Sequence, residues 1–259
     1  MCRIAAWSGP DIALEDIVIR PAHSLLVQSQ HATEAKLAVN GDGFGIAWYG
    51  HGAEPGLYRD VLPAWADGNL VSLCRMVHSR RFIAHIRAST MGETSRANCH
   101  PFTHGRWSFC HNGQVPHFPR IRRTLESALP DALYHHRRGT TDSEAVFLTL
   151  LANGLDSDPA RAWRATFDAI GIAGDEGPIR VTCVFSDGDT LWALRWASDG
   201  KAPTLYLSDS FPGGGRAIAS EPLCGDAARW QALPCGTLCA LGPDGALRTE
   251  PLFPLRAAV

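Results

Sequence analysis

Apolar stretches near the start of the chain predict short strands separated by turns. Residues 3–7 form a mostly apolar run that ends at the turn signal Ser8-Gly9-Pro10, so we expect a buried strand there. Further strands are expected over residues 46–49, 57–62, 81–87 and 106–113. The last of these ends in the dipeptide Asn112-Gly113, which is typical of a hairpin turn.

The middle of the chain has the apolar spacing of helices, and its end returns to strands. We expect helices over residues 65–78, 118–129, 145–151 and 159–170, with Thr141, Asp142 or Ser143 available to cap the third. Strands are expected over residues 179–185, 190–196, 204–207, 216–220, 237–241 and 246–250. No linker or repeat interrupts this order, which predicts a single α+β domain over residues 1–259, with two sheets and covering helices.

Composition narrows the class of protein. Hydrophobic residues make up 45% of the chain, the net charge is −2 and there is no long basic run, which argues against nucleic acid as a partner. There is no leader-like segment and no apolar run of spanning length, so we expect a cytoplasmic protein that does not enter membranes. The eight cysteines are irregularly spaced without a CxxC pair, and most are expected to be reduced packing residues.

The second residue, Cys2, has the chemistry of a nucleophile if Met1 is removed. The new terminus would then carry a thiol, with a reference pKa of about 8.5, and an α-amine, with one of about 7.7–8.0. An uncharged amine can take the proton of the thiol, so the base belongs to the same residue as the nucleophile. The alternative is that Cys2 is simply a small, partly buried apolar residue.

Four further residues suit acyl transfer from an amide. The side-chain amide of Asn112 and the backbone N–H of Gly113 can converge on one oxygen as an oxyanion hole, unless the pair is only a hairpin turn. Arg87 can bind a carboxylate and Asp142 an ammonium group. Alternatively, Arg87 forms a surface ion pair and Asp142 caps a helix.

Metal and cofactor chemistry is not expected. His100 and His104 are four residues apart, but Pro101 makes a helix between them improbable, so they need not share a face. There is no HExxH motif, and the glycines of Asn40-Gly41-Asp42-Gly43-Phe44-Gly45 precede a strand rather than the helix that a phosphate cradle requires.

Taken together, these stretches resemble the class II glutamine amidotransferases of the N-terminal nucleophile hydrolase fold. The matching stretches lie in family order along nearly the whole chain: Met1-Cys2, residues 40–45, His85-Ile86-Arg87-Ala88-Ser89-Thr90, Asn98-Cys99-His100-Pro101-Phe102, His111-Asn112-Gly113 and Thr141-Asp142-Ser143-Glu144, followed by Ala219-Ser220-Glu221-Pro222 and Pro234-Cys235-Gly236. Each motif is weak alone, but an N-terminal Cys followed by all of them in order is a strong signal.

The resemblance implies a four-layer αββα sandwich and a small-molecule substrate, glutamine or a γ-glutamyl amide. It implies that Cys2 attacks the amide and forms a thioester, while Asn112 and Gly113 form the oxyanion hole. Arg87 and Thr90 would bind the α-carboxylate, Asp142 would bind the α-ammonium, and His100 is placed among the substrate-binding residues. No metal or cofactor is implied, and the products would be glutamate and either ammonia or an amine.

The chain departs from the synthase-linked members of the family at two positions. Val39 stands where those members have an Arg, and Ala88 stands where a Trp usually follows the substrate-binding Arg. A fused synthase domain does not fit in 259 residues, so the chain resembles the compact stand-alone branch, which includes the γ-glutamyl amide hydrolase of ergothioneine biosynthesis. A separate synthase subunit is still allowed as a partner.

Two other functions remain open. One is an N-terminal nucleophile acylase or peptidase of different specificity, and the other is a non-catalytic regulatory subunit that binds glutamine. Activity on peptides or acylated amines would favour the first. Glutamine binding that survives Cys2→Ala without any turnover would favour the second.

Overall fold

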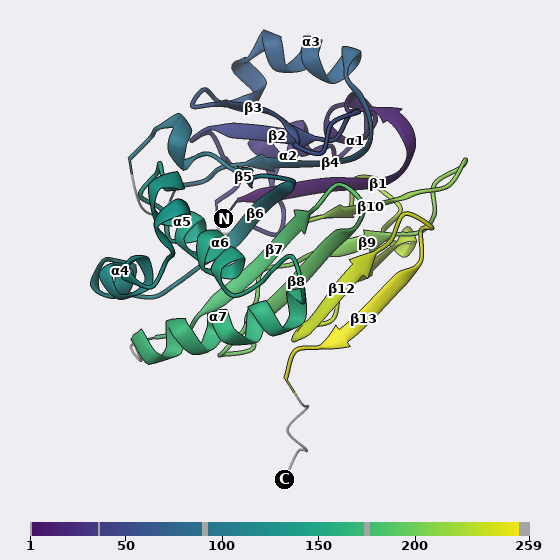
Figure 1. Ribbon diagram of the computed structural model, residues 1–259. Helices are drawn as coiled ribbons and strands as arrows, with labels where there is room; N and C mark the ends of the chain where they lie inside the picture. Colours follow the sequence, from purple (N-terminus) through teal and green to yellow (C-terminus); the bar gives the residue numbers. More distant parts are fainter. Residues whose placement is uncertain (1, 36, 90–92, 174–176, 254–259) are drawn as a thin grey trace.

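The computed structural model describes residues 2–35, 37–89, 93–173 and 177–253. Within these ranges the strands form two sheets that lie between two layers of helices (Figure 1). The first sheet has the order β11 (Trp230–Ala232), β9 (Tyr206–Ser208), β10 (Arg216–Ala219), β1 (Arg3–Ala13), β4 (His78–Ile86), β2 (Phe44–Trp48), β3 (Gly56–Asp60). The second has the order β13 (Leu247–Pro251), β12 (Thr237–Leu241), β8 (Leu191–Ala197), β7 (Arg180–Ser186), β6 (Trp107–Gln114), β5 (Phe102–His104).

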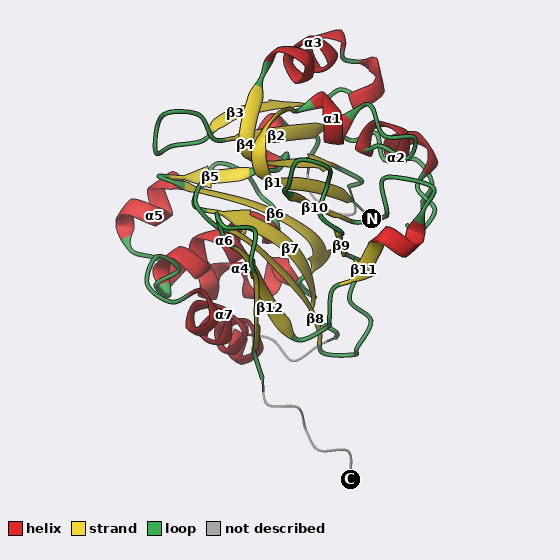
Figure 2. Ribbon diagram, turned by 90° about the vertical axis from the view of Figure 1, so that its right-hand side faces the viewer, coloured by secondary structure: helices red, strands yellow, loops and turns green. Residues whose placement is uncertain are grey.

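Helices cover the outer face of each sheet, as Figure 2 shows. The first sheet packs against α1 (Glu15–Val18), α2 (Leu25–His31) and α3 (Gly68–Met76). The second packs against α4 (Phe118–Ser127), α6 (Asp142–Ala152) and α7 (Pro159–Ala173), with α5 (Asp131–His136) between α4 and α6 in the chain. A third apolar cluster fills the space between the sheets, with Ile4, Ile83 and Val184 among its members. All the strand pairs within the described residues are antiparallel, so the predicted αββα architecture is confirmed.

The first strand is longer than the sequence predicts. The turn expected at Ser8-Gly9-Pro10 is wrong, because β1 continues to Ala13. Its pairing with β4 shifts register between Ser8 and Ile12, and a proline without an N–H is tolerated at such an irregularity. A Cβ atom at Gly9 would overlap Gly215 and the ring of Trp7, so the glycine is required by close packing.

Other boundaries differ in smaller ways. The helix expected over residues 65–78 begins only at Gly68, where Asp67 caps it by accepting from the N–H groups of Asn69 and Leu70. A short 3-10 turn, η1 (Ala64–Ala66), precedes it. The pattern did not predict α1, α5, β5 or β11. These elements have only three to six residues each, too few to show a period.

Strand register determines which residues lie together at one end of the first sheet. Arg3 pairs with Ile86, and Phe44 pairs with the same residue from the other side. Cys2, which precedes β1, and Arg87, which follows β4, therefore lie at the same end of these two strands.

No helix in the described part of the chain is long and apolar enough to cross a membrane.

Candidate active site

Cys2 is half-buried at the start of β1 and is held on two sides. Its thiol lies 3.5 Å from the carbonyl oxygen of Ala88 and 3.4 Å from the Ala88 backbone N–H, which donates to the sulfur. Its own carbonyl oxygen accepts from Nε of Arg3 at 2.7 Å and from Nδ2 of Asn112 at 2.8 Å. The position of the residue is therefore fixed by both its side chain and its backbone.

Opposing effects act on the Cys2 thiol. Burial is the largest and raises its pKa above the ordinary value, because a thiolate is poorly solvated there. The Ala88 N–H and the positive charges of Arg87 and Arg3 act in the opposite direction and lower this pKa. Because burial prevails, an adjacent base is needed to generate the thiolate near neutral pH.

Arg87 is a buried residue, so the surface position considered as an alternative is wrong. Its side chain is 3% exposed. Nη1 donates to the carbonyl oxygen of Asp42 at 3.3 Å, and Nη2 donates to Oγ of Ser89 at 3.0 Å. The Asp42 carboxylate in turn accepts from the Ser89 N–H at 2.7 Å. These bonds hold a guanidinium beside the Cys2 thiol.

Asn112 and Gly113 lie within a strand, so the prediction of a hairpin turn at these residues is wrong. Strand β6 continues through both residues to Gln114, and they pair with Thr182 and Val181 of β7. The long pairing with β7 outweighs the local preference of an Asn-Gly dipeptide for a turn. A Cβ atom at Gly113 would overlap the carbonyl oxygen of Arg180 and the ring of His111, so glycine is required at this position.

The N-terminus of α6 forms another part of the site. Thr141 is its N-cap, one of the three residues proposed for that role, and its side chain accepts from the Glu144 N–H. Asp142 is therefore not the cap. Its carboxylate accepts from the Val115 N–H at 2.9 Å, from the Ser143 N–H at 2.8 Å and from the Ser143 hydroxyl at 3.3 Å, and it remains slightly exposed. A carboxylate can accept about four hydrogen bonds, so it has capacity beyond these three.

His100 lies against a second buried histidine, His85, with ring centroids 4.2 Å apart. Within the described residues, none of the four ring nitrogens has a hydrogen-bond partner. Burial lowers the pKa of His85 to about 3 and that of His100 well below its ordinary value. Both rings are therefore neutral at neutral pH.

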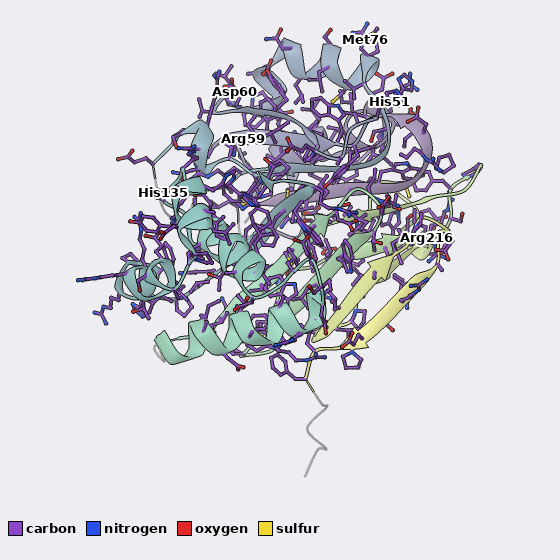
Figure 3. The ribbon with its side chains drawn as sticks, in the orientation of Figure 1. His51, Arg59, Asp60, Met76, His135 and Arg216 are labelled. Atoms are coloured by element: carbon purple, nitrogen blue, oxygen red, sulfur yellow. The ribbon has the colours of Figure 1, made fainter. Side chains whose placement is uncertain are left out.

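The segment that carries His100 is tied to strand β3. Nη1 of Arg59 donates to the carbonyl oxygen of Cys99 at 3.0 Å, and Asp60 pairs with Arg96 in the short 3-10 turn η2 (Arg96–Asn98). Figure 3 labels Arg59 and Asp60 on the side of the molecule that also carries His135 of α5. These contacts hold in place the segment that positions His100 at the site.

One pocket brings most of the predicted residues together. Its lining within the described chain is Cys2, Arg87, Ala88, Ser89, His100, His111, Gly113, Thr140, Thr141, Asp142 and Ser143. Asn112 reaches the same place through its bond to the Cys2 carbonyl. Thr90 and Met1, which the sequence also implicates, lie outside the described residues.

Some contributions to the site were not predicted. Ala88 acts through its backbone and has no polar side chain to signal a role. His111 and Ser143 line the pocket and are joined by a bond of 2.9 Å between Nδ1 and Oγ. Arg3 could have been noticed, because it is the one charged residue in the run of residues 3–7.

Comparisons with known proteins agree on a family. The sequence model described as glutamine amidotransferases class-II matches residues 20–200. The chain is 30% identical to a probable glutamine amidotransferase, DUG3, of Saccharomyces cerevisiae over 93% of this chain and 82% of that protein. It is also 30% identical to the gamma-glutamyl-hercynylcysteine sulfoxide hydrolase of Mycobacterium tuberculosis, over 86% of this chain and 85% of that protein.

Solved structures show the same likeness. A glutamine aminotransferase class-II domain protein from Silicibacter pomeroyi superimposes with a TM-score of 0.77 at 36% sequence identity. The match covers 98% of this chain and all of that one.

Proposed function

The chain belongs to the class-II glutamine amidotransferases, and from this premise we propose that it is a Cys-dependent amidohydrolase acting on glutamine or a γ-glutamyl amide. The observation that carries the proposal is the pocket in which the Cys2 thiol, the Arg87 guanidinium and the Asp142 carboxylate meet. A nucleophile flanked by one cationic and one anionic group suits an amino acid whose side-chain amide reaches the thiol.

Substrate recognition would use opposite charges on the two walls of the pocket. Arg87 binds the α-carboxylate through charge-assisted hydrogen bonds, and Asp142 accepts from the α-ammonium. Both side chains are already held by neighbours, Arg87 by Asp42 and Ser89, and Asp142 by Val115 and Ser143. Little reorganisation is therefore needed when the substrate binds.

The reaction would proceed through a thioester after removal of Met1. The α-amine of Cys2 takes the thiol proton, and the sulfur attacks the γ-carbonyl carbon. The resulting oxyanion accepts from the Gly113 N–H and from the side-chain amide of Asn112, which turns from the Cys2 carbonyl to reach it. The C–N bond then breaks, and the leaving nitrogen takes the proton from the α-amine. Water cleaves the thioester, which releases glutamate and restores the thiol.

The relatives support the chemistry at this level. One is named as a glutamine amidotransferase, and another as a hydrolase of a γ-glutamyl compound. Both names refer to a γ-glutamyl or glutamine amide and differ in the group attached to the nitrogen. That shared part is what the pocket residues Arg87 and Asp142 would contact.

The test is the release of glutamate from L-glutamine and from a panel of γ-glutamyl amides by the purified protein. We expect turnover that Cys2→Ser and Cys2→Ala abolish, whereas Cys235→Ser, at an exposed cysteine, leaves it unchanged. Glutaramic acid lacks the α-ammonium and should not be hydrolysed. Turnover in Cys2→Ala, or hydrolysis of N-acyl amines in place of γ-glutamyl amides, would contradict the proposal.

A further inference from the structure

We propose that Arg3, held in place by Glu221, is a positioning residue for Cys2. It fixes the carbonyl group of the nucleophile while Asn112 turns its amide toward the oxyanion. The inference rests on the proposed function of Cys2 as the nucleophile.

Arg3 forms hydrogen bonds to two acceptors through two different nitrogens of its guanidinium group. Nε donates to the Cys2 carbonyl oxygen at 2.7 Å, and Nη1 donates to Oε1 of Glu221 at 2.6 Å. Successive side chains of a strand point to opposite faces, so Arg3 and Cys2 project from opposite faces of the first sheet. A planar guanidinium can reach back to the preceding carbonyl and still meet a carboxylate.

Glu221 is itself fixed by many donors. Besides Arg3, its carboxylate accepts from the backbone and hydroxyl of Thr33, from the Glu34 N–H and from Nε2 of His23. Burial alone would raise the pKa of Glu221, but the hydrogen bonds from Thr33 and His23 prevail and lower it to about 2. Glu221 therefore stays ionised and keeps Arg3 in one orientation.

A contribution to folding stability does not by itself explain the buried ion pair between Arg3 and Glu221. The side chains of Arg3 and Glu221 are 0% and 1% exposed. Removing two charges from water costs about as much as their attraction returns, so buried ion pairs often stabilise a fold no better than apolar residues. What such a pair does supply is a fixed geometry, and here that geometry ends on the carbonyl of the nucleophile.

The bond from Arg3 to the Cys2 carbonyl also matters for Asn112, which contacts the same carbonyl and is proposed to bind the oxyanion. In this structure its Nδ2 donates to the Cys2 carbonyl at 2.8 Å. The proposed reaction needs the same amide at the oxyanion. Because Arg3 supplies a second, charge-assisted bond to that carbonyl, Asn112 can shift during the reaction without releasing the nucleophile.

The experiment compares Arg3→Lys and Glu221→Gln with a matched control, Arg81→Lys. Arg81 is also a buried arginine beside β1, but it donates to Ser8 and Gly188 and does not line the pocket. Lysine keeps the charge of Arg3 but cannot present the same fork to two acceptors. For each variant, kcat, KM, the thermal midpoint and the alkylation rate of Cys2 by iodoacetamide, located by peptide mapping, are measured.

We expect kcat to fall about ten- to a hundredfold in Arg3→Lys and Glu221→Gln, with KM within about twofold, because misplacement of a reacting group costs that much. The Cys2 alkylation rate should change in both. Arg81→Lys should lower the thermal midpoint while leaving kcat and the alkylation rate unchanged. If Arg3→Lys does not fold, Glu221→Gln, which is nearly isosteric, provides the same comparison.

The positioning role is overturned if Arg3→Lys and Glu221→Gln behave like Arg81→Lys, with reduced stability but unchanged kcat and alkylation. This failure is distinct from failure of the proposed function. In the latter case Cys2→Ala would keep its turnover, and the alkylation rate of Cys2 would still report whether Arg3 positions the thiol.

Discussion

The side-chain amide of Asn112 donates a hydrogen bond of 2.8 Å to the carbonyl oxygen of Cys2, although 110 positions separate the two residues. The contact joins the residue that precedes β1 of the first sheet to β6 of the second sheet. It places an amide donor directly beside the candidate nucleophile, where an oxyanion would form.

Asn112→Ala should therefore lower kcat by about a hundredfold or more, because an oxyanion donor acts mainly on the transition state. The variant keeps strand β6, so KM should change little. Steady-state kinetics with the best γ-glutamyl amide check this. Gln114→Ala, at the exposed end of the same strand, should have no effect. A change confined to KM would argue against the oxyanion role.

Arg87→Ala should raise KM by about tenfold or more, since it removes a charge-assisted bond to the α-carboxylate. The control is Arg106→Ala, which removes an exposed arginine paired with Asp187 and Asp189. Initial rates over a range of substrate concentrations separate KM from kcat. An unchanged KM in Arg87→Ala would refute carboxylate binding by this residue.

Gly113→Ala should destabilise the protein by about 1–3 kcal/mol, because the added methyl group overlaps the Arg180 carbonyl and His111. Gly171→Ala is a suitable comparison. It lies in α7 with open space around its Cβ position, and it should be neutral or stabilising. Urea unfolding measures both. A Gly113→Ala protein as stable as the wild type would show that β6 and β7 can separate locally.

Stability should fall on acidification through the buried histidines. The pKa of His85 is about 3 in the folded protein, against an ordinary value of 6.5 when unfolded. Between these values the unfolded chain binds more protons, so stability is present above about pH 6.5 and is lost as the pH falls toward 3. His85→Phe should reduce the slope of the free energy of unfolding against pH by up to about 1.4 kcal/mol per pH unit. Urea unfolding from pH 4 to pH 7 tests it, and an unchanged slope would contradict it. His51→Gln, at an exposed histidine, is the control.

Much of the fold could be predicted because it is encoded in local spacing. The apolar runs of β4, β7 and α6 appear within single windows of sequence, and the structure confirms them. The turn signals at Gly9-Pro10 and Asn112-Gly113 were misleading. At both places the chain continues as a strand, because pairing with β4 on either side of Gly9-Pro10, and with β7 at Asn112-Gly113, outweighs a local preference.

The candidate site was only partly accessible from the sequence. The resemblance named Cys2, Arg87, His100, Gly113 and Asp142, and the structure brings all five to one pocket. The proposed role of Glu221 depends on a contact with a residue 218 positions away, which no local pattern contains. The proposed role of Thr90 stays a prediction.

The central claim, that Cys2 is the nucleophile of a γ-glutamyl site, is tested most directly by intact mass spectrometry with a γ-diazoketone analogue of glutamine. The thiolate would displace N₂ and leave one covalent adduct. We expect a starting mass without Met1, one adduct on the wild-type protein, and none on Cys2→Ala. An adduct that persists in Cys2→Ala would contradict the claim, as would a processed, γ-glutamyl-hydrolysing wild-type protein that takes no label.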